Sequence, residues 1–263
     1  MCREEEPAGY TPQMPNASGS QRSQDHYPDN LLDRATPKER LIRFSELLRE
    51  REAALWRESR LLEPRNGEPT RVLSVGCGCD ARTGLEQNNP RVWGVDSNPD
   101  FVAAARALGN VQGVELGSAS KLPFPEETFD VVFFRLVLHH VVFQQPLAPV
   151  FREAKRVLRP GGHVVMLEPN LWHPVGILLA ASNRLRWSRR IMGSIDDCPL
   201  DPLSLKRQLR SHGFSVRVIG VEYGWRRLPI LVQDLLAGLA PLGGVPGLSH
   251  LAHTIAVFAA KAW

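Results

Sequence analysis

The sequence has only four cysteines in 263 residues, and they form no recognisable disulfide framework or metal-binding pattern. Cys77 and Cys79 are separated by one residue, a spacing that fits neither a C-x-x-C metal knuckle nor a redox pair. No uninterrupted apolar run is long enough to span a bilayer, and the first residues contain no apolar segment of signal-peptide length. We therefore expect a reducing, cytoplasmic setting and no metal.

The sequence also lacks a concentrated basic run. The formal net charge is +4, and the positive residues, mostly arginine, are spread along the chain. Nucleic-acid binding is therefore only a minor hypothesis. Apolar residues make up 43% of the chain, which is enough for a proper core, and the length suits one α/β domain with decorations.

The N-terminal part divides into two segments. Residues 1–28 are polar, rich in Pro, Ser and Gln and without periodicity, so we expect a flexible tail, or one that orders over a bound ligand. Residues 29–66 are expected to form a helical extension or lid. Thr36 and Glu39 have the spacing of a capping box, and Pro37 suits the first helical position, which predicts a helix or a broken pair of helices.

The stretch from residue 71 to Asp96 carries the main functional signal. Residues 72–75 are a short apolar run, and the chain then turns through Gly76-Cys77-Gly78 into a segment expected to start a helix. A second apolar run ends at Asp96. In a strand-loop-helix-strand unit this carboxylate lies beside the glycine turn, where it can accept from both hydroxyls of a ribose.

The glycine spacing by itself leaves alternatives open. Gly76, Gly78 and Ala81 also satisfy the dinucleotide-binding pattern G-x-G-x-x-G/A, so a nicotinamide oxidoreductase is one alternative. A tight turn followed by a solvated aspartate is another.

Strands and helices alternate along the rest of the chain, which indicates an α/β fold with a parallel sheet. The predicted strands are 72–75, 92–95, 111–116, 129–134 and 163–167, and the predicted helices include 99–107 and 145–158. Arg159-Pro160-Gly161-Gly162 is expected to terminate the second of these helices.

Five motifs in order, VLSVGCG, VWGVDSNP, KLPFPEETFDVV, VLHHV and REAKRVLRPGGHVVMLEP, cover about residues 71 to 169. With them the chain resembles a class I S-adenosylmethionine-dependent methyltransferase of the group similar to the ubiquinone/menaquinone and small-molecule methyltransferases. The resemblance implies a Rossmann-like seven-stranded sheet, mostly parallel, with helices on both faces and an antiparallel last strand between the fifth and sixth. It places a methyltransferase domain at 67–263, with cap segments at 170–200 and 223–252. The family's C-terminal part implies a helix at 203–212, a sixth strand at 213–221 and a last strand at 254–261.

By resemblance, S-adenosyl-L-methionine is the cofactor. The residues expected to bind it are Gly76, Cys77, Gly78, Asp80, Asp96, Ser97, Ser118, Ala119, Arg135 and Leu136. The chain departs from the family at Ser74, where an acid is common, at Asp80, which replaces a third glycine, and at Ser118, which replaces an aspartate. Asp80 either contacts the cofactor's amino group or caps the following helix. These departures leave a non-catalytic, cofactor-binding scaffold as an alternative.

The expected catalytic residues are His139, Glu168 and His140. His139 is the one we expect to face the acceptor as a general base, while Glu168 is a base, a substrate clamp or a ligand for backbone amides. The expected substrate residues are Trp172, His173 and Tyr223, in or next to cap segments that also suit a membrane surface, a dimer contact or core packing.

The function predicted from these residues is in-line methyl transfer to an O, N or C atom of a small, largely apolar metabolite, by a monomer or homodimer. An RNA or protein methyltransferase is the alternative within the family, although the chain lacks an Asn-Pro-Pro-Tyr type motif after the fourth strand.

Overall fold

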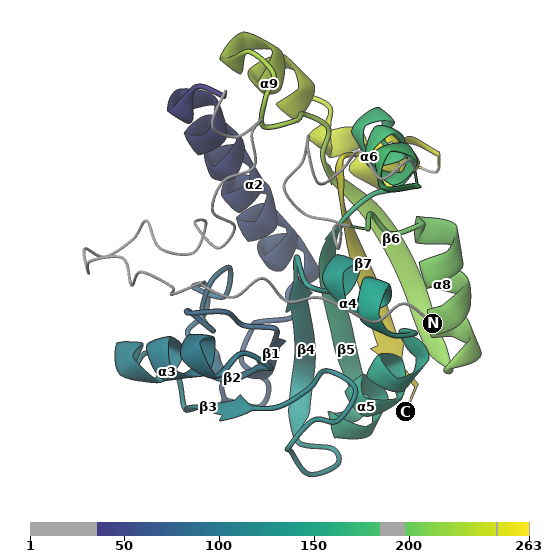
Figure 1. Cartoon of the computed structure of the whole chain (residues 1–263). Coiled ribbons are helices and arrows are strands. Elements are labelled where there is room, and N and C mark those ends of the chain that lie inside the picture. The colour runs from purple at the N-terminus through teal and green to yellow at the C-terminus, as the bar shows by residue number, and fades with distance from the viewer. Residues whose placement is uncertain (1–35, 185–197, 246, 263) are drawn as a thin grey trace, which may run out of the picture.

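The structure is a computed structural model, and it describes residues 36–184, 198–245 and 247–262. The predicted tail at 1–28 and the arginine-rich part of the first cap segment at 185–197 lie outside the described residues. A twisted sheet runs through the centre of the molecule with helices on both faces (Figure 1).

The sheet has seven strands in the order β3-β2-β1-β4-β5-β7-β6. The strands are β1 (Arg71–Val75), β2 (Arg91–Asp96), β3 (Gly113–Leu116), β4 (Phe129–Arg135), β5 (Leu158–Pro169), β6 (Phe214–Glu222) and β7 (Thr254–Lys261). The pairs among β1 to β5 are parallel, whereas β7 is antiparallel to both β5 and β6. This confirms the predicted fold, including the insertion of the last strand between the fifth and sixth.

Two apolar layers lie on the two faces of the sheet. One contains α2 (Lys38–Ser59) and α3 (Pro99–Leu108), and the other contains α4 (Leu138–Gln144), α5 (Ala148–Val157) and α8 (Pro202–Ser211). Alternation along β4 explains the division, because Val131 and Phe133 pack in the first layer while Val132 and Phe134 pack in the second.

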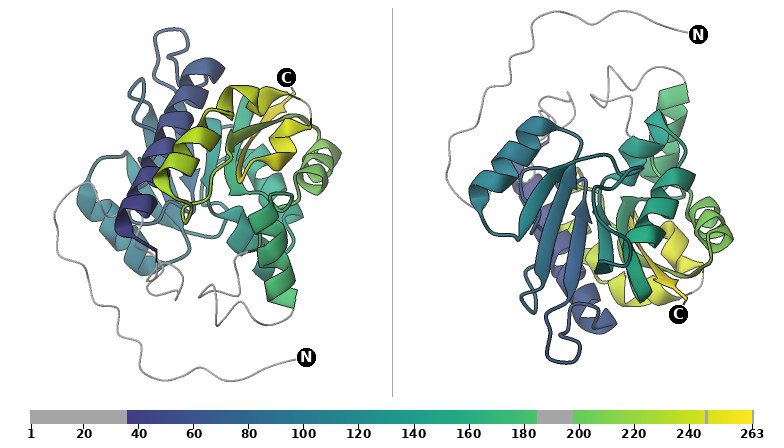
Figure 2. Two further views of the ribbon diagram at one scale, coloured as in Figure 1. Left: turned by 90° about the horizontal axis from the view of Figure 1, so that it is seen from above. Right: turned by 90° about the horizontal axis from the view of Figure 1, so that it is seen from below.

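The remaining helices lie beyond the carboxyl ends of the parallel strands (Figure 1). They are α6 (Pro174–Arg184), α9 (Ile230–Ala237) and the short 3-10 helices η1 (Ala240–Gly244) and η2 (Leu248–Leu251). Figure 2 shows α9 alongside α2, where Arg43 of α2 is paired with Asp234 of α9 at 2.7 Å. The cap segments therefore gather at the edge of the sheet where ligands bind in such folds.

Within residues 36–66, the described part of the N-terminal extension, the chain forms one continuous helix, α2, and not a broken pair. The helix begins at Lys38, so Pro37 is its N-cap residue, with ψ 132°, and lies one position before the first helical position predicted for it. The helix buries one face that includes Phe44, Leu48 and Trp56, and the Trp56 ring meets Phe133 edge-on at 5.1 Å.

The helix predicted directly after the glycine turn is not formed. Residues 81–84 make only turns, and no regular helix separates β1 from β2. Gly84 (φ +79°), Asn88 (φ +56°) and Asn89 (φ +44°) have left-handed backbone conformations. Three such residues in so short a connection interrupt any right-handed helical run.

The segment around Arg159-Pro160-Gly161-Gly162 also differs from the prediction. The helix α5 ends at Val157, and Leu158 already belongs to β5, paired with Phe129. The register then shifts between Phe129 and Val131, so the proline and glycines form an irregular start to the strand and do not cap a helix.

Candidate functional site

The glycine turn and Asp96 meet at the carboxyl edge of the sheet, as predicted. The amide of Gly78 donates to Oδ2 of Asp96 at 2.9 Å, and the amide of Asn98 donates to Oδ1 at 2.9 Å. Gly76 donates to the carbonyl oxygen of Val95 at 2.8 Å, which ties the turn to β2. Each carboxylate oxygen keeps a further lone pair, so Asp96 is oriented by the backbone and can still accept from a ligand.

The backbone around the turn is left-handed at three positions. Gly76 has φ +66°, Gly78 has φ +57°, and Leu136, directly after β4, has φ +56°. A Cβ atom at Gly76 would lie 2.6 Å from both methyl groups of Val137, so the turn packs closely against the start of α4. A left-handed leucine is uncommon, and such strain is typical of ligand-binding positions.

The residues expected near the adenosine follow β2 and β3. Ser97 is exposed directly after Asp96, and Gly117 donates its amide to the Asp96 carbonyl oxygen at 2.9 Å, which brings Ser118 close to Asp96. The Ser118 hydroxyl lies 3.0 Å from that of Ser120, while Ala119 packs against the core. The structure thus brings this group together beside Asp96.

Asp80 accepts from the Arg82 amide at 3.0 Å and from Asn110 Nδ2 at 3.1 Å. It therefore caps a local turn, since the helix that it was expected to cap is absent. Burial, with a smaller contribution from the nearby Asp96 carboxylate, raises the pKa of the Cys77 thiol to about 12. Such a thiol stays protonated at neutral pH, so Cys77 is not a nucleophile.

Glu168, at the end of β5, is completely buried and binds the first turn of α4. Its Oε1 accepts from the amides of Val137 at 3.0 Å and Leu138 at 2.8 Å, and its Oε2 lies 3.4 Å from the amide nitrogen of His139. A carboxylate at a helix N-terminus satisfies amides that have no partner within the helix. Of the three roles considered for Glu168, the structure displays the ligand for backbone amides.

The same carboxylate orients the side chain of His139. Nδ1 of His139 lies 2.7 Å from Oε2 of Glu168, and the imidazole is buried. Because a carboxylate can only accept, Nδ1 of the neutral imidazole carries the proton in this contact, which leaves the lone pair on Nε2. The ring of His140 lies 4.0 Å from that of His139, centroid to centroid. Glu168, His139 and His140 therefore form one cluster beside the glycine turn.

Arg135 ends β4 and makes an ion pair that the sequence did not predict. Its Nε donates to both carboxylate oxygens of Glu52 in α2, at 3.1 and 3.0 Å. Burial raises the pKa of Glu52 above its ordinary value, and the Arg135 guanidinium offsets only part of this shift. Glu52 lies on the buried face of α2, four residues from Leu48 and four from Trp56, and this acid within an apolar pattern was the signal that could have identified it.

The three expected substrate residues fall into two places. Trp172 is half-exposed and donates its indole N–H to Asp201 at the N-terminus of α8, at 2.8 Å. His173 lies beside Tyr223 and meets the ring of His253 edge-on at 5.1 Å. Burial lowers the pKa of His173, and the Tyr223 hydroxyl donates to the Leu248 carbonyl oxygen at 3.2 Å.

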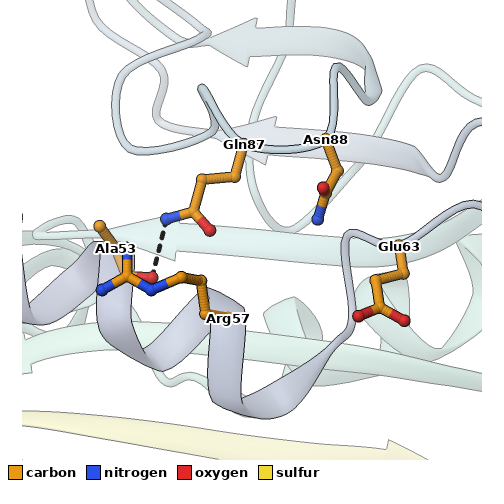
Figure 3. Close-up of a pocket in the computed structure, with 5 residues that line it drawn as sticks. All are labelled: Ala53, Arg57, Glu63, Gln87 and Asn88. Carbon is orange, nitrogen blue, oxygen red and sulfur yellow. Dashed lines mark hydrogen bonds between the residues drawn. The ribbon is translucent and has the colours of Figure 1, made fainter.

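A separate hollow lies beside the last turns of α2. It is lined by Ala53, Arg57, Glu63, Gln87 and Asn88, with Gln87 Nε2 donating to the Ala53 carbonyl oxygen at 2.7 Å (Figure 3). None of the predicted site residues lines it. Within the described part of the chain, no helix has the length and apolar content to cross a membrane, and no three His, Cys, Asp or Glu side chains are grouped to hold a metal ion.

Residues 73–166 match the family model described as "Methyltransferase domain". An uncharacterized methyltransferase, C70.08c, of Schizosaccharomyces pombe is 39% identical over 100 residues, which are 36% of this chain and 38% of that protein. The ubiquinone/menaquinone biosynthesis C-methyltransferase UbiE of Cupriavidus taiwanensis is 30% identical over 42% of this chain and 47% of its own length. A fatty-acid O-methyltransferase of Mycolicibacterium smegmatis is 37% identical over 36% of this chain and 36% of its own length. The chain thus spans less than half the length of these relatives.

Among solved structures, the YcgJ protein of Bacillus subtilis is similar with a TM-score of 0.55 and 18% identity, over 81% of this chain and 99% of that one. This likeness supports the fold. Residues 73–166 are thus similar to a methyltransferase domain family, and the curated relatives that match this region carry methyltransferase names.

Proposed function

We propose that this chain, with its methyltransferase domain at residues 73–166, transfers a methyl group from S-adenosyl-L-methionine to an O, N or C atom of a small, largely apolar metabolite. The observation that carries the proposal is the Asp96 carboxylate, fixed by the amides of Gly78 and Asn98 at the edge of the sheet. An acid so oriented beside a glycine turn suits the two hydroxyls of a ribose.

The chain's residues fit this cofactor. Gly76 and Gly78 offer bare backbone for the methionine part, Asp96 suits the ribose, and Ser97, Ser118 and Ala119, beside Asp96, would contact the adenine. When bound, the cofactor supplies an activated methyl group on a positively charged sulfur. The protein's main task is then to align the acceptor and exclude water, which is worth on the order of 7 to 11 kcal/mol in such reactions.

His139 is the group that we propose as general base. Its Nδ1 is held by Glu168 at 2.7 Å, so Nε2 is the nitrogen able to take a proton from a hydroxyl or amine acceptor. Glu168 acts through His139 and through the amides of α4, and is in this scheme a positioning residue.

The acceptor is proposed to be apolar because of the surface beyond the sheet edge. In α9, Leu231 and Leu235 are 81% and 75% exposed, and in α6 Ile177 and Leu178 are more than half exposed. Exposed apolar side chains at this density are typical of binding surfaces. Two relatives with apolar substrates in their names, the fatty-acid and the ubiquinone/menaquinone enzymes, agree with this choice.

Calorimetry with S-adenosylmethionine, S-adenosylhomocysteine and NADH tests the proposal. We expect binding of the two adenosyl compounds, and Asp96→Ala should weaken both about tenfold or more, because each charged hydrogen bond is worth about 1.5 to 3 kcal/mol. A preference for NADH would refute the proposal in favour of an oxidoreductase. Binding without turnover on any acceptor would favour a scaffold.

The acceptor is best sought in cell extract incubated with methyl-labelled cofactor. Mass spectrometry should find a small apolar product heavier by one methyl group, while labelled RNA or protein would favour the alternative within the family. His139→Ala should lower turnover and leave cofactor affinity nearly unchanged. An unaffected rate would rule His139 out as the base.

A further inference from the structure

The ion pair between Arg135 and Glu52 leaves most of the arginine's donors unused. Only Nε contacts Glu52, and the side chain of Arg135 is 19% exposed while that of Glu52 is 2% exposed. Within residues 36–184, 198–245 and 247–262, no acceptor is bonded to the two terminal nitrogens of Arg135. These nitrogens carry four N–H groups in a planar fork, which matches a carboxylate.

Arg135 is placed close to the glycine turn. It is the last residue of β4, Leu136 follows with its left-handed backbone, and Val137 contacts Gly76 directly. Val137, which packs against the turn where the methionine part is proposed to lie, is therefore only two residues from Arg135 in the sequence. That part of the cofactor ends in a carboxylate.

Glu52 fixes the direction of the guanidinium. Glu52 projects from α2 against the connection that follows β1. A Cβ atom at Gly84 in that connection would overlap the Glu52 carboxylate. A buried carboxylate bonded to Nε restrains the guanidinium and leaves its two terminal nitrogens available to a ligand.

We propose, on the basis of the proposed function, that Arg135 binds the carboxylate of the cofactor's methionine part through its two terminal nitrogens, and that Glu52 is the positioning residue that orients it. The N-terminal helix α2 thereby contributes to cofactor selection. An acceptor carrying a carboxylate is the other source of the same chemistry, and the experiment separates the two.

The test compares S-adenosylmethionine with decarboxylated S-adenosylmethionine, which lacks only the carboxylate, by equilibrium binding without acceptor. Arg135→Gln should weaken binding of the intact cofactor about 10- to 100-fold, as expected for a charge-assisted pair, and should change binding of the decarboxylated form less than about threefold. Glu52→Gln should also weaken binding of the intact cofactor more than binding of the decarboxylated form, but by a smaller factor, because the arginine remains and is only less restrained.

Arg43→Ala is the matched control. It removes another ion pair of α2, with Asp234, away from β4, and the ratio of the two affinities should stay at the wild-type value. If Arg135→Gln alone is unstable because Glu52 is left buried and unpaired, the double variant Glu52→Gln, Arg135→Gln removes both charges, and the same ratio is measured.

If neither affinity changed in the Arg135 variants, this inference would be overturned, and a carboxylate on the acceptor would be the remaining ligand for the arginine. Equal loss for both compounds would also overturn it, because it would show a purely structural role. If the wild-type protein bound neither compound, the proposed function itself would fail, so the two failures are distinguishable.

Discussion

Replacing Glu168 with glutamine separates its structural role from its effect on His139. The amide oxygen of glutamine can still accept from Val137 and Leu138, but its NH2 group then faces Nδ1 of His139, which must become the acceptor. The proton moves to Nε2, and the proposed base loses its lone pair. We expect the variant to lose about 2 kcal/mol of folding free energy, the worth of a charged hydrogen bond.

The turnover rate of Glu168→Gln should fall by a large factor even though the variant stays folded. Loss of a general base costs about 10²- to 10⁴-fold in rate, while affinity for S-adenosylhomocysteine should change less than about threefold. Glu168→Ala should cost about 3 to 5 kcal/mol, because it leaves buried donors without an acceptor. Guanidinium unfolding curves, calorimetry and initial rates measure the three quantities.

Glu153→Gln is a suitable control for this experiment. Glu153 also accepts a backbone amide, that of Leu122 at 2.8 Å, but lies in α5 away from His139. It should leave the rate unchanged. If Glu168→Gln kept the full wild-type rate while folded, the argument that Glu168 sets the tautomer of a catalytic His139 would be refuted.

Three further predictions concern the turn and the buried ionisable groups. Gly76→Ala should lose at least about 1 to 2 kcal/mol from its left-handed backbone, with more from overlap with Val137, and should weaken S-adenosylhomocysteine binding; unchanged melting and affinity would contradict the packing described. Burial lowers the pKa of His253 from 6.5 to about 3. Between these two pH values the unfolded chain binds a proton at this histidine and the folded chain does not, so the free energy of unfolding should fall by about 2 kcal/mol from pH 7.5 to 5. In His253→Phe this loss of stability between pH 7.5 and 5 should disappear from the unfolding free energies measured by urea titration. An equal loss in the variant would show that another group causes it. Cys77, with its pKa near 12, should resist iodoacetamide at pH 8 until the protein is unfolded, and rapid labelling of the native protein in peptide maps would contradict its burial.

The features that follow local rules could be predicted from the sequence. The glycine turn and Asp96 lie within one strand-turn-strand unit, so their meeting needed only the parallel pairing of β1 and β2. The resemblance supplied the position of β7. The roles of individual residues at the site remain predictions, since geometry alone does not test them.

The features missed depend on partners far apart in the sequence. Arg135 and Glu52 are separated by 83 residues, and Glu168 lies about 30 residues from the amides that it binds. The missing helix after the glycine turn had a different cause, because three left-handed residues in that connection outweighed the expectation from the fold. At residues 159–162, proline and glycine fit a helix end and an irregular strand equally well, and pairing with β4 decided between them.

The insertion of β7 between β5 and β6 has a consequence during synthesis on the ribosome. Every other strand is made before β7, yet β6 has no partner until β7 arrives, and one edge of β5 stays open until then. An open, apolar strand edge invites pairing with other chains. A nascent chain halted before Thr254 would therefore carry the five paired strands β1 to β5 and an unpaired β6, and we expect chaperone dependence and aggregation to be decided when β7 is translated.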